Sequence, residues 1–153
     1  MQCALIKDKH LGHQIGRVSR NFQAFFINEL KAYNLSFEQG VVLLYIEEDS
    51  QIYINHIAKE LDKNKATISR EIQRLIAKGF ASKKLAQNDK RTYIFTLTPK
   101  GKNASLLLRT KLMQLEALIH EICTQQEIDT CLDVLTRIRL MLEDALLKQS
   151  QLA

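Results

Sequence analysis

The chain has 153 residues, of which 46% are hydrophobic, so it is long and apolar enough for one folded domain, and this composition argues against global disorder. Its formal net charge is +5 and its pI is near 9.2. The first ten residues mix acids and bases, which argues against a signal peptide, and no apolar run approaches the roughly 20 residues of a membrane span, so we expect a cytoplasmic protein.

The first third of the chain is predicted to be helical. From about residue 8 to residue 33, apolar residues recur at steps of three or four, which predicts one long amphipathic helix. Ser36 and Gln39 then have the spacing of a capping box, in which each residue satisfies a backbone N–H of the other. A second helix is therefore expected to begin at this point.

Two further helices, joined by a short turn, are predicted in the middle of the chain. The apolar residues from Ile54 to Leu61 have helical spacing, and Asp62 belongs to a residue type that tolerates the left-handed backbone of a sharp turn. Asn64 is a favourable N-cap for the next helix, which Gly79 is expected to end. Two helices joined by about four residues are typical of a helix-turn-helix.

The second of these helices has a polar face opposite its apolar one. No acidic residue interrupts this face except Glu71, toward the side. Cations and hydrogen-bonding groups on a recognition helix contact phosphates and base edges, whereas the alternative is an ordinary solvated helix face. The candidate DNA contacts on this helix are Lys65, Thr67, Ser69, Arg70, Gln73 and Arg74.

The positive charge is concentrated in the same region. Between Ile54 and Lys102 there are twelve Lys or Arg residues and four acidic residues, whereas the rest of the chain is mildly acidic. Such an asymmetry indicates that the middle of the chain contacts a polyanion.

A β-hairpin is predicted next. Residues 80–87 and 92–98 are β-prone, and the second run alternates in the manner of a half-buried strand. Lys90 and Arg91 fall at the predicted tip, where an arginine can enter the negative potential of a narrow minor groove. Thr98 and Pro99 form a cap and a first helical residue, so a helix is expected to follow the hairpin directly.

Two long helices are predicted after Lys102, the second opened by a capping box of Thr124 and Glu127. A helix of about 23 residues is about 35 Å long. A compact monomer of this size has a radius of gyration of only about 15 Å. We therefore expect the apolar faces of these helices to pair with a second copy about a two-fold axis.

In this order, the elements resemble the MarR family of winged helix-turn-helix transcriptional regulators. The segments that carry the likeness are Leu35–Ile46, Ile57–Leu61, Ala66–Phe80 and Asn88–Gly101. The most specific part is the pattern D-x-R…LT-x-x-G, formed by Asp89, Arg91, Leu97, Thr98 and Gly101. One departure is Asp62, where the family often has glycine.

The resemblance implies a mainly α fold with a small β-hairpin wing, in a single domain over residues 1–153. The winged lobe would span about residues 36–101, and dimerisation helices would span about 8–33 and 102–149. The implied protein is a homodimeric, DNA-binding repressor, released from a pseudo-palindromic operator by a small, often aromatic effector. In this family, Arg91 would be the minor-groove arginine and Asp89 the acid that holds it.

Other control mechanisms and functions remain as alternatives. Cys3 is a candidate for redox control, while Cys123 and Cys131 are expected to be buried. His10 and His13 are spaced as a pair that can share a metal, although no metal site or cofactor is predicted. A winged helix that contacts a protein is a further possibility, and the absence of catalytic motifs argues against an enzyme.

An effector pocket is expected between the dimerisation helices and the DNA-binding lobe, as is usual in the family. Four aromatic residues could line such a pocket or belong to the ordinary core: Phe22, Phe25, Phe26 and Tyr45.

Overall fold

The computed structural model describes residues 10–48, 54–86 and 89–151. They form two compact units, one up to Lys111 and the other from Leu112 onward. Helix α6 crosses this boundary. The elements in chain order are α1 (Leu11–Phe25), α2 (Ile27–Ala32), α3 (Phe37–Glu48), α4 (Ile54–Glu60), α5 (Lys65–Ala77), β1 (Ala81–Ala86), β2 (Asp89–Leu97), α6 (Pro99–Ile122) and α7 (Gln125–Gln151).

The prediction of one long N-terminal helix was wrong. The described part of this segment forms two helices, α1 and α2, which are separated at Phe26, where ψ is −2°. The Phe26 side chain is buried and makes edge-to-face contacts with the rings of Phe25 and Phe37. The break thus places an aromatic ring in the core. The Phe26 N–H still donates to the Gln23 carbonyl at 3.2 Å, and the Phe26 carbonyl accepts the Leu30 N–H at 3.1 Å.

The capping residues read from the sequence are confirmed. The Gln39 N–H donates to Ser36 Oγ at 3.2 Å, and the Ser36 N–H donates to Gln39 Oε1 at 3.3 Å. At the start of α5, the Thr67 N–H donates to Asn64 Oδ1 at 2.8 Å. Asp62 adopts a φ of 48°, as the sharp turn between α4 and α5 requires.

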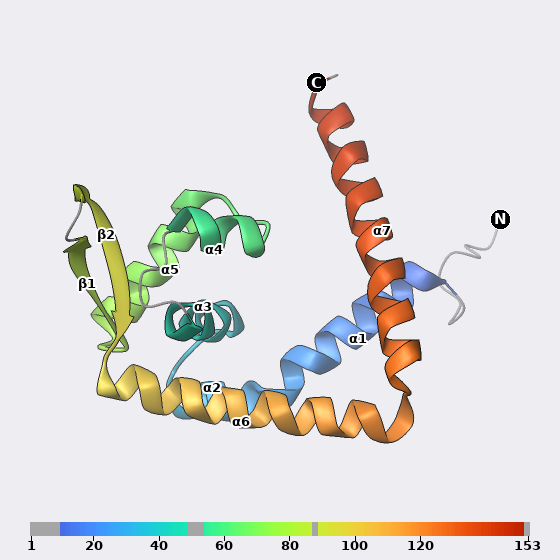
Figure 1. The fold of residues 1–153 in the computed structure, drawn as a ribbon, viewed down its shortest axis with the longest axis horizontal. Helices are drawn as coiled ribbons and strands as arrows, with labels where there is room; N and C mark the ends of the chain where they lie inside the picture. Colours follow the sequence, from blue (N-terminus) through green and yellow to red (C-terminus); the bar gives the residue numbers. More distant parts are fainter. Residues whose placement is uncertain (1–9, 49–53, 87–88, 152–153) are drawn as a thin grey trace. The chain divides into compact units, whose positions relative to one another are not determined.

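The core of the first unit lies among α3, α4, α5 and the hairpin. Helix α5 packs against α3, α4 and β1, and α3 also contacts β2, as Figure 1 shows. Each large apolar side chain buried here contributes about 1.5–3 kcal/mol to folding. The almost completely buried apolar side chains include Val42, Leu43, Ile46, Ile57, Ile68, Ile72, Leu75 and Phe80.

The hairpin is an antiparallel pair in which Ala81 lies opposite Leu97 and Leu85 opposite Tyr93. The register is irregular after Leu85, because the next pair joins Ala86 to Asp89. The backbone of residues 89–91 therefore belongs to β2, whereas the sequence had placed Asp89, Lys90 and Arg91 in the connecting tip. A strand irregularity of this kind depends on cross-strand pairing and leaves no period-two signal in the sequence.

A close joint connects the hairpin to α6. The hydroxyl of Thr98 accepts the Gly101 N–H at 3.1 Å and donates to the Gly79 carbonyl at 2.7 Å. The Thr98 N–H donates to the Phe80 carbonyl at 3.0 Å. A Cβ atom on Gly101 would lie 2.0 Å from that carbonyl oxygen, so only glycine fits at this position.

The second unit consists of the end of α6 and the helix α7. The Glu127 carboxylate accepts the backbone N–H of Thr124 at 2.8 Å, which confirms the capping box. No residue described in α7 is buried. Cys131, which was expected to be buried, is exposed, and Cys123 is partly exposed. In the described ranges, no helix has both the length and the apolarity needed to cross a membrane.

Gly101→Ala should lower the free energy of unfolding by about 1–3 kcal/mol, because the added methyl group forces the hairpin and α6 apart. Urea unfolding followed by circular dichroism measures this loss. Gly12→Ala is the matched control, since a Cβ atom at Gly12 meets nothing within 4 Å and should cause no loss. Equal stability of the two variants would contradict the proposed steric role of Gly101.

Candidate nucleic-acid interface

The candidate interface begins with the outer face of α5. Because Ile68, Ile72 and Leu75 are buried on one side of this helix, its other side faces solvent. Of the six predicted contacts, Lys65, Arg70, Gln73 and Arg74 are exposed, while Thr67 and Ser69 are partly exposed. The structure thus brings all six to the solvent-accessible part of one helix.

The same face carries two exposed alanines that were not predicted from the sequence. Ala66 and Ala77 are exposed, and with Arg70 and Gln73 they form a stripe at spacings of four, three and four residues. Small side chains allow the backbone of a helix to approach another surface closely. Helical spacing counted from Arg70 could have identified both of them.

A polar network that links α5 to α3 was also not predicted from the sequence. Glu71 Oε1 accepts a hydrogen bond from Arg74 Nη1 at 2.6 Å, and Glu71 Oε2 accepts one from Gln39 Nε2 at 3.0 Å. Lys78 Nζ donates to Gln39 Oε1 at 2.9 Å and to the Asn34 carbonyl at 2.5 Å. These residues lie up to 44 positions apart in the chain, so no local sequence pattern predicts the network.

The hairpin supplies the second part of the candidate interface. Asp89, Lys90 and Arg91 lie on β2 by their backbone, and their side chains lie outside the described part of the structure. On β1, Lys83 and Lys84 are exposed, and the Lys83 ammonium lies 5.0 Å from the centre of the Tyr93 ring. The middle of β1 therefore carries cations in addition to those predicted for the tip of the hairpin.

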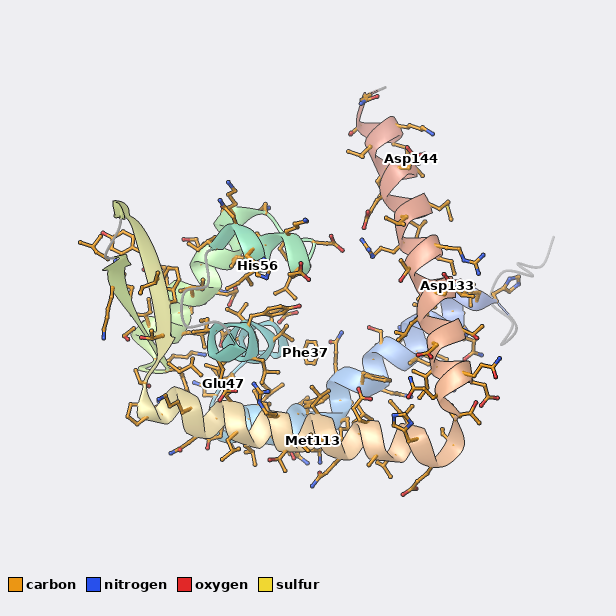
Figure 2. All side chains as sticks on the ribbon, in the orientation of Figure 1. Phe37, Glu47, His56, Met113, Asp133 and Asp144 are labelled. Carbon is orange, nitrogen blue, oxygen red and sulfur yellow. The ribbon has the colours of Figure 1, made fainter. Side chains whose placement is uncertain are left out.

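Glu47 anchors the body of the lobe to α6. The Ser105 hydroxyl donates to Glu47 Oε2 at 2.5 Å, and Arg109 Nη2 donates to the same oxygen at 2.8 Å. Figure 2 shows Glu47 on the side of α3 that faces α6. Burial alone would raise the pKa of Glu47, but the hydrogen bonds from Ser105 and Arg109 outweigh burial and lower this pKa.

We expect the contribution of Glu47 to stability to depend on pH. Because the folded-state pKa lies below the ordinary value of 4.5, the stabilisation is present above pH 4.5 and is lost as the pH falls through the lowered value. Urea unfolding of the protein and of Glu47→Gln should therefore give a difference near neutrality that shrinks on acidification. Glu38→Gln on the exposed side of α3 is the control, and an equal pH dependence of both variants would contradict this role.

A cavity of about 440 Å³ lies where α1, α2 and the start of α3 meet. Its lining includes the apolar side chains of Ile27, Leu35 and Phe37, and the cations Arg20 and Lys31. Among the described residues that line this cavity, Phe37 is the aromatic one. The four aromatic residues considered from the sequence, namely Phe22, Phe25, Phe26 and Tyr45, do not belong to its lining.

The metal-dependent alternative rested on His10 and His13. Among the residues whose placement is described, no group of three or more His, Cys, Asp or Glu side chains is arranged to hold a metal ion. Cys3, the residue of the redox alternative, lies outside the described residues.

Comparison with known families identifies the kind of protein that carries this interface. Residues 24–106 match the family model described as transcriptional regulator SarA/Rot. The chain belongs to this family. It is a MarR-like winged-helix transcriptional regulator and not an enzyme, as the sequence predicted.

Individual relatives agree with this assignment. The HTH-type transcriptional regulator BilQ of Clostridioides difficile (strain CD3) is 30% identical over 91 residues, which are 60% of this chain and 62% of that protein. The match thus spans less than two thirds of that relative.

Two solved structures have the same fold. A Listeria monocytogenes chain assigned to the MarR family, in a complex with a 26mer DNA, is 26% identical, with a TM-score of 0.76 over 90% of this chain and 91% of that one. A MarR protein from Peptoclostridium difficile DA00132 is 23% identical, with a TM-score of 0.77 over 95% of each chain.

Proposed function

We propose that this regulator binds double-stranded DNA, with the exposed face of α5 in the major groove and the hairpin against the neighbouring minor groove. The observation that carries this proposal is the outer face of α5, where two arginines, a lysine and a glutamine face solvent opposite a buried apolar side. The Listeria monocytogenes relative with 26mer DNA supports it, because that protein has the same fold. The wing contacts of Lys90 and Arg91, supported by Asp89, are part of the proposal.

Arg70→Gln should weaken binding to a DNA duplex and make the dependence of log K on log salt shallower by about 0.9, which is the loss of one phosphate contact. Fluorescence anisotropy at several salt concentrations measures both quantities. Arg137→Gln on α7 removes the same charge from an exposed position outside the proposed interface and should leave binding unchanged. Equal losses in the two variants would show that α5 is not the DNA-binding face.

We further propose that two copies form the functional unit through α1, α6 and α7. None of the described residues of α1 or α7 is buried. Along α7, apolar side chains recur on one face and remain half exposed, as at Leu132 with 57% and Leu142 with 50%. Since burying such a side chain is worth about 1.5–3 kcal/mol, a second copy is the natural cover for this face.

Sedimentation at micromolar concentration should give twice the chain mass of 17.6 kDa. Leu142→Asp should shift the equilibrium toward the monomer, because it places a charge on the apolar face of α7. Thr130→Asp is the matched control on the exposed, charged side of the same helix. Sedimentation of the unaltered protein as a 17.6 kDa species would contradict the dimer.

A two-fold dimer would place its two α5 helices on half-sites about 34–36 Å apart, so the operator should be pseudo-palindromic. We propose repression as the outcome, acting on DNA in the cytoplasm. A small aromatic or apolar anion is the effector that fits the cavity near α2, because Arg20 and Lys31 flank its apolar lining. Sequence-blind binding across fragments of the genome would contradict specific regulation.

A further inference from the structure

Two arginines on the outer face of α5 have different surroundings. The Arg70 guanidinium has the Thr67 hydroxyl at 3.4 Å as its hydrogen-bond acceptor. Arg74 instead donates to the Glu71 carboxylate at 2.6 Å and forms an ion pair with it. A carboxylate therefore offsets the charge of Arg74, whereas the hydroxyl beside Arg70 is neutral. The two arginines lie on the same helix, and both are exposed.

Glu71 is held in place from its other side. Its side chain is only 13% exposed, and Gln39 Nε2 donates to its second carboxylate oxygen at 3.0 Å. The orientation of the Gln39 amide is set by its oxygen, which accepts from the Ser36 N–H and from the Lys78 ammonium. If Glu71 swung toward solvent, the Gln39 N–H group, in a residue only 4% exposed, would lose its acceptor.

This fixation separates the Glu71–Arg74 pair from an ordinary surface salt bridge. Most exposed ion pairs contribute little to the free energy of unfolding, since two flexible side chains must be ordered to form them. Here the carboxylate is already ordered by Gln39, so only Arg74 loses freedom. The pair thus holds the Arg74 guanidinium beside the Glu71 carboxylate, which offsets its charge.

We propose that Glu71 is a positioning residue for DNA binding, which restrains Arg74 and thereby lowers sequence-independent affinity for phosphates. The inference rests on the proposed role of the α5 face. A free arginine is attracted to any phosphate and carries no sequence information there. An arginine held in one direction forms bonds only with a base edge or phosphate that lies in that direction.

The test uses a short DNA duplex of random sequence and the full-length protein. Glu71→Gln should bind this duplex several-fold more tightly at low salt, and its log–log salt dependence should be steeper by about 0.9, because one more cation is available to phosphates. Glu60→Gln is the matched control: it makes the same change in net charge at an exposed position on α4 and should not steepen the slope. Circular dichroism confirms that each variant is folded.

A double-mutant cycle tests whether Glu71 acts through Arg74. In a protein that already carries Arg74→Gln, the change Glu71→Gln should no longer steepen the slope. Without any change at Glu71, Arg74→Gln should make the salt dependence shallower by a smaller amount than Arg70→Gln does. This comparison remains available if the Glu71 variant does not fold.

The outcomes separate this inference from the proposed function. An unchanged slope in Glu71→Gln, an effect that persists in the Arg74→Gln background, or equal slopes for Arg70→Gln and Arg74→Gln would each overturn the role of Glu71. If the unaltered protein shows no salt-dependent binding to any duplex, the proposed function fails and the inference fails with it.

Discussion

The packing of α5 against α3 and α4 buries one apolar side of the helix, formed by Ile68, Ile72 and Leu75. This burial determines the direction in which every other side chain of α5 points. A helix has one orientation about its axis once three residues on one side are fixed in a core. The polar residues therefore face outward as a consequence of apolar packing, without needing any contact of their own. The same constraint turns Glu71 inward to the flank, where Gln39 meets it.

Charge and geometry have separate parts in this arrangement. The concentration of cations in the middle of the chain provides long-range attraction to a polyanion but does not distinguish one DNA sequence from another. Discrimination requires side chains held in defined directions, and the network around Gln39 supplies such restraint on α5. In the role proposed for Glu71, its pairing with Arg74 reduces the general attraction to phosphates and favours contacts in one direction.

The predictions that succeeded depend on local interactions. The capping boxes at Ser36 and Thr124, the N-cap at Asn64 and the left-handed turn at Asp62 each involve groups within a few residues of one another. The outer face of α5 was also predictable, because helical periodicity alone assigns its residues. By contrast, the break at Phe26 depends on an aromatic contact with Phe37 in another helix.

The hydrogen bond between Gln39 and Glu71 joins residues 32 positions apart, so it could not have been predicted from local spacing. The extension of β2 back to Asp89 likewise results from cross-strand pairing with Ala86. In both cases the partner is chosen by tertiary packing.

The joint at Thr98 has a mechanical consequence. One hydroxyl group caps α6 and bonds to the residue that ends the turn after α5, while Gly101 lets the helix backbone rest directly on the Phe80 carbonyl. No flexible linker separates the strand from the helix, because α6 begins two residues after β2 ends. A rotation of the first turn of α6 about its own axis would therefore rotate the base of the hairpin together with the helix.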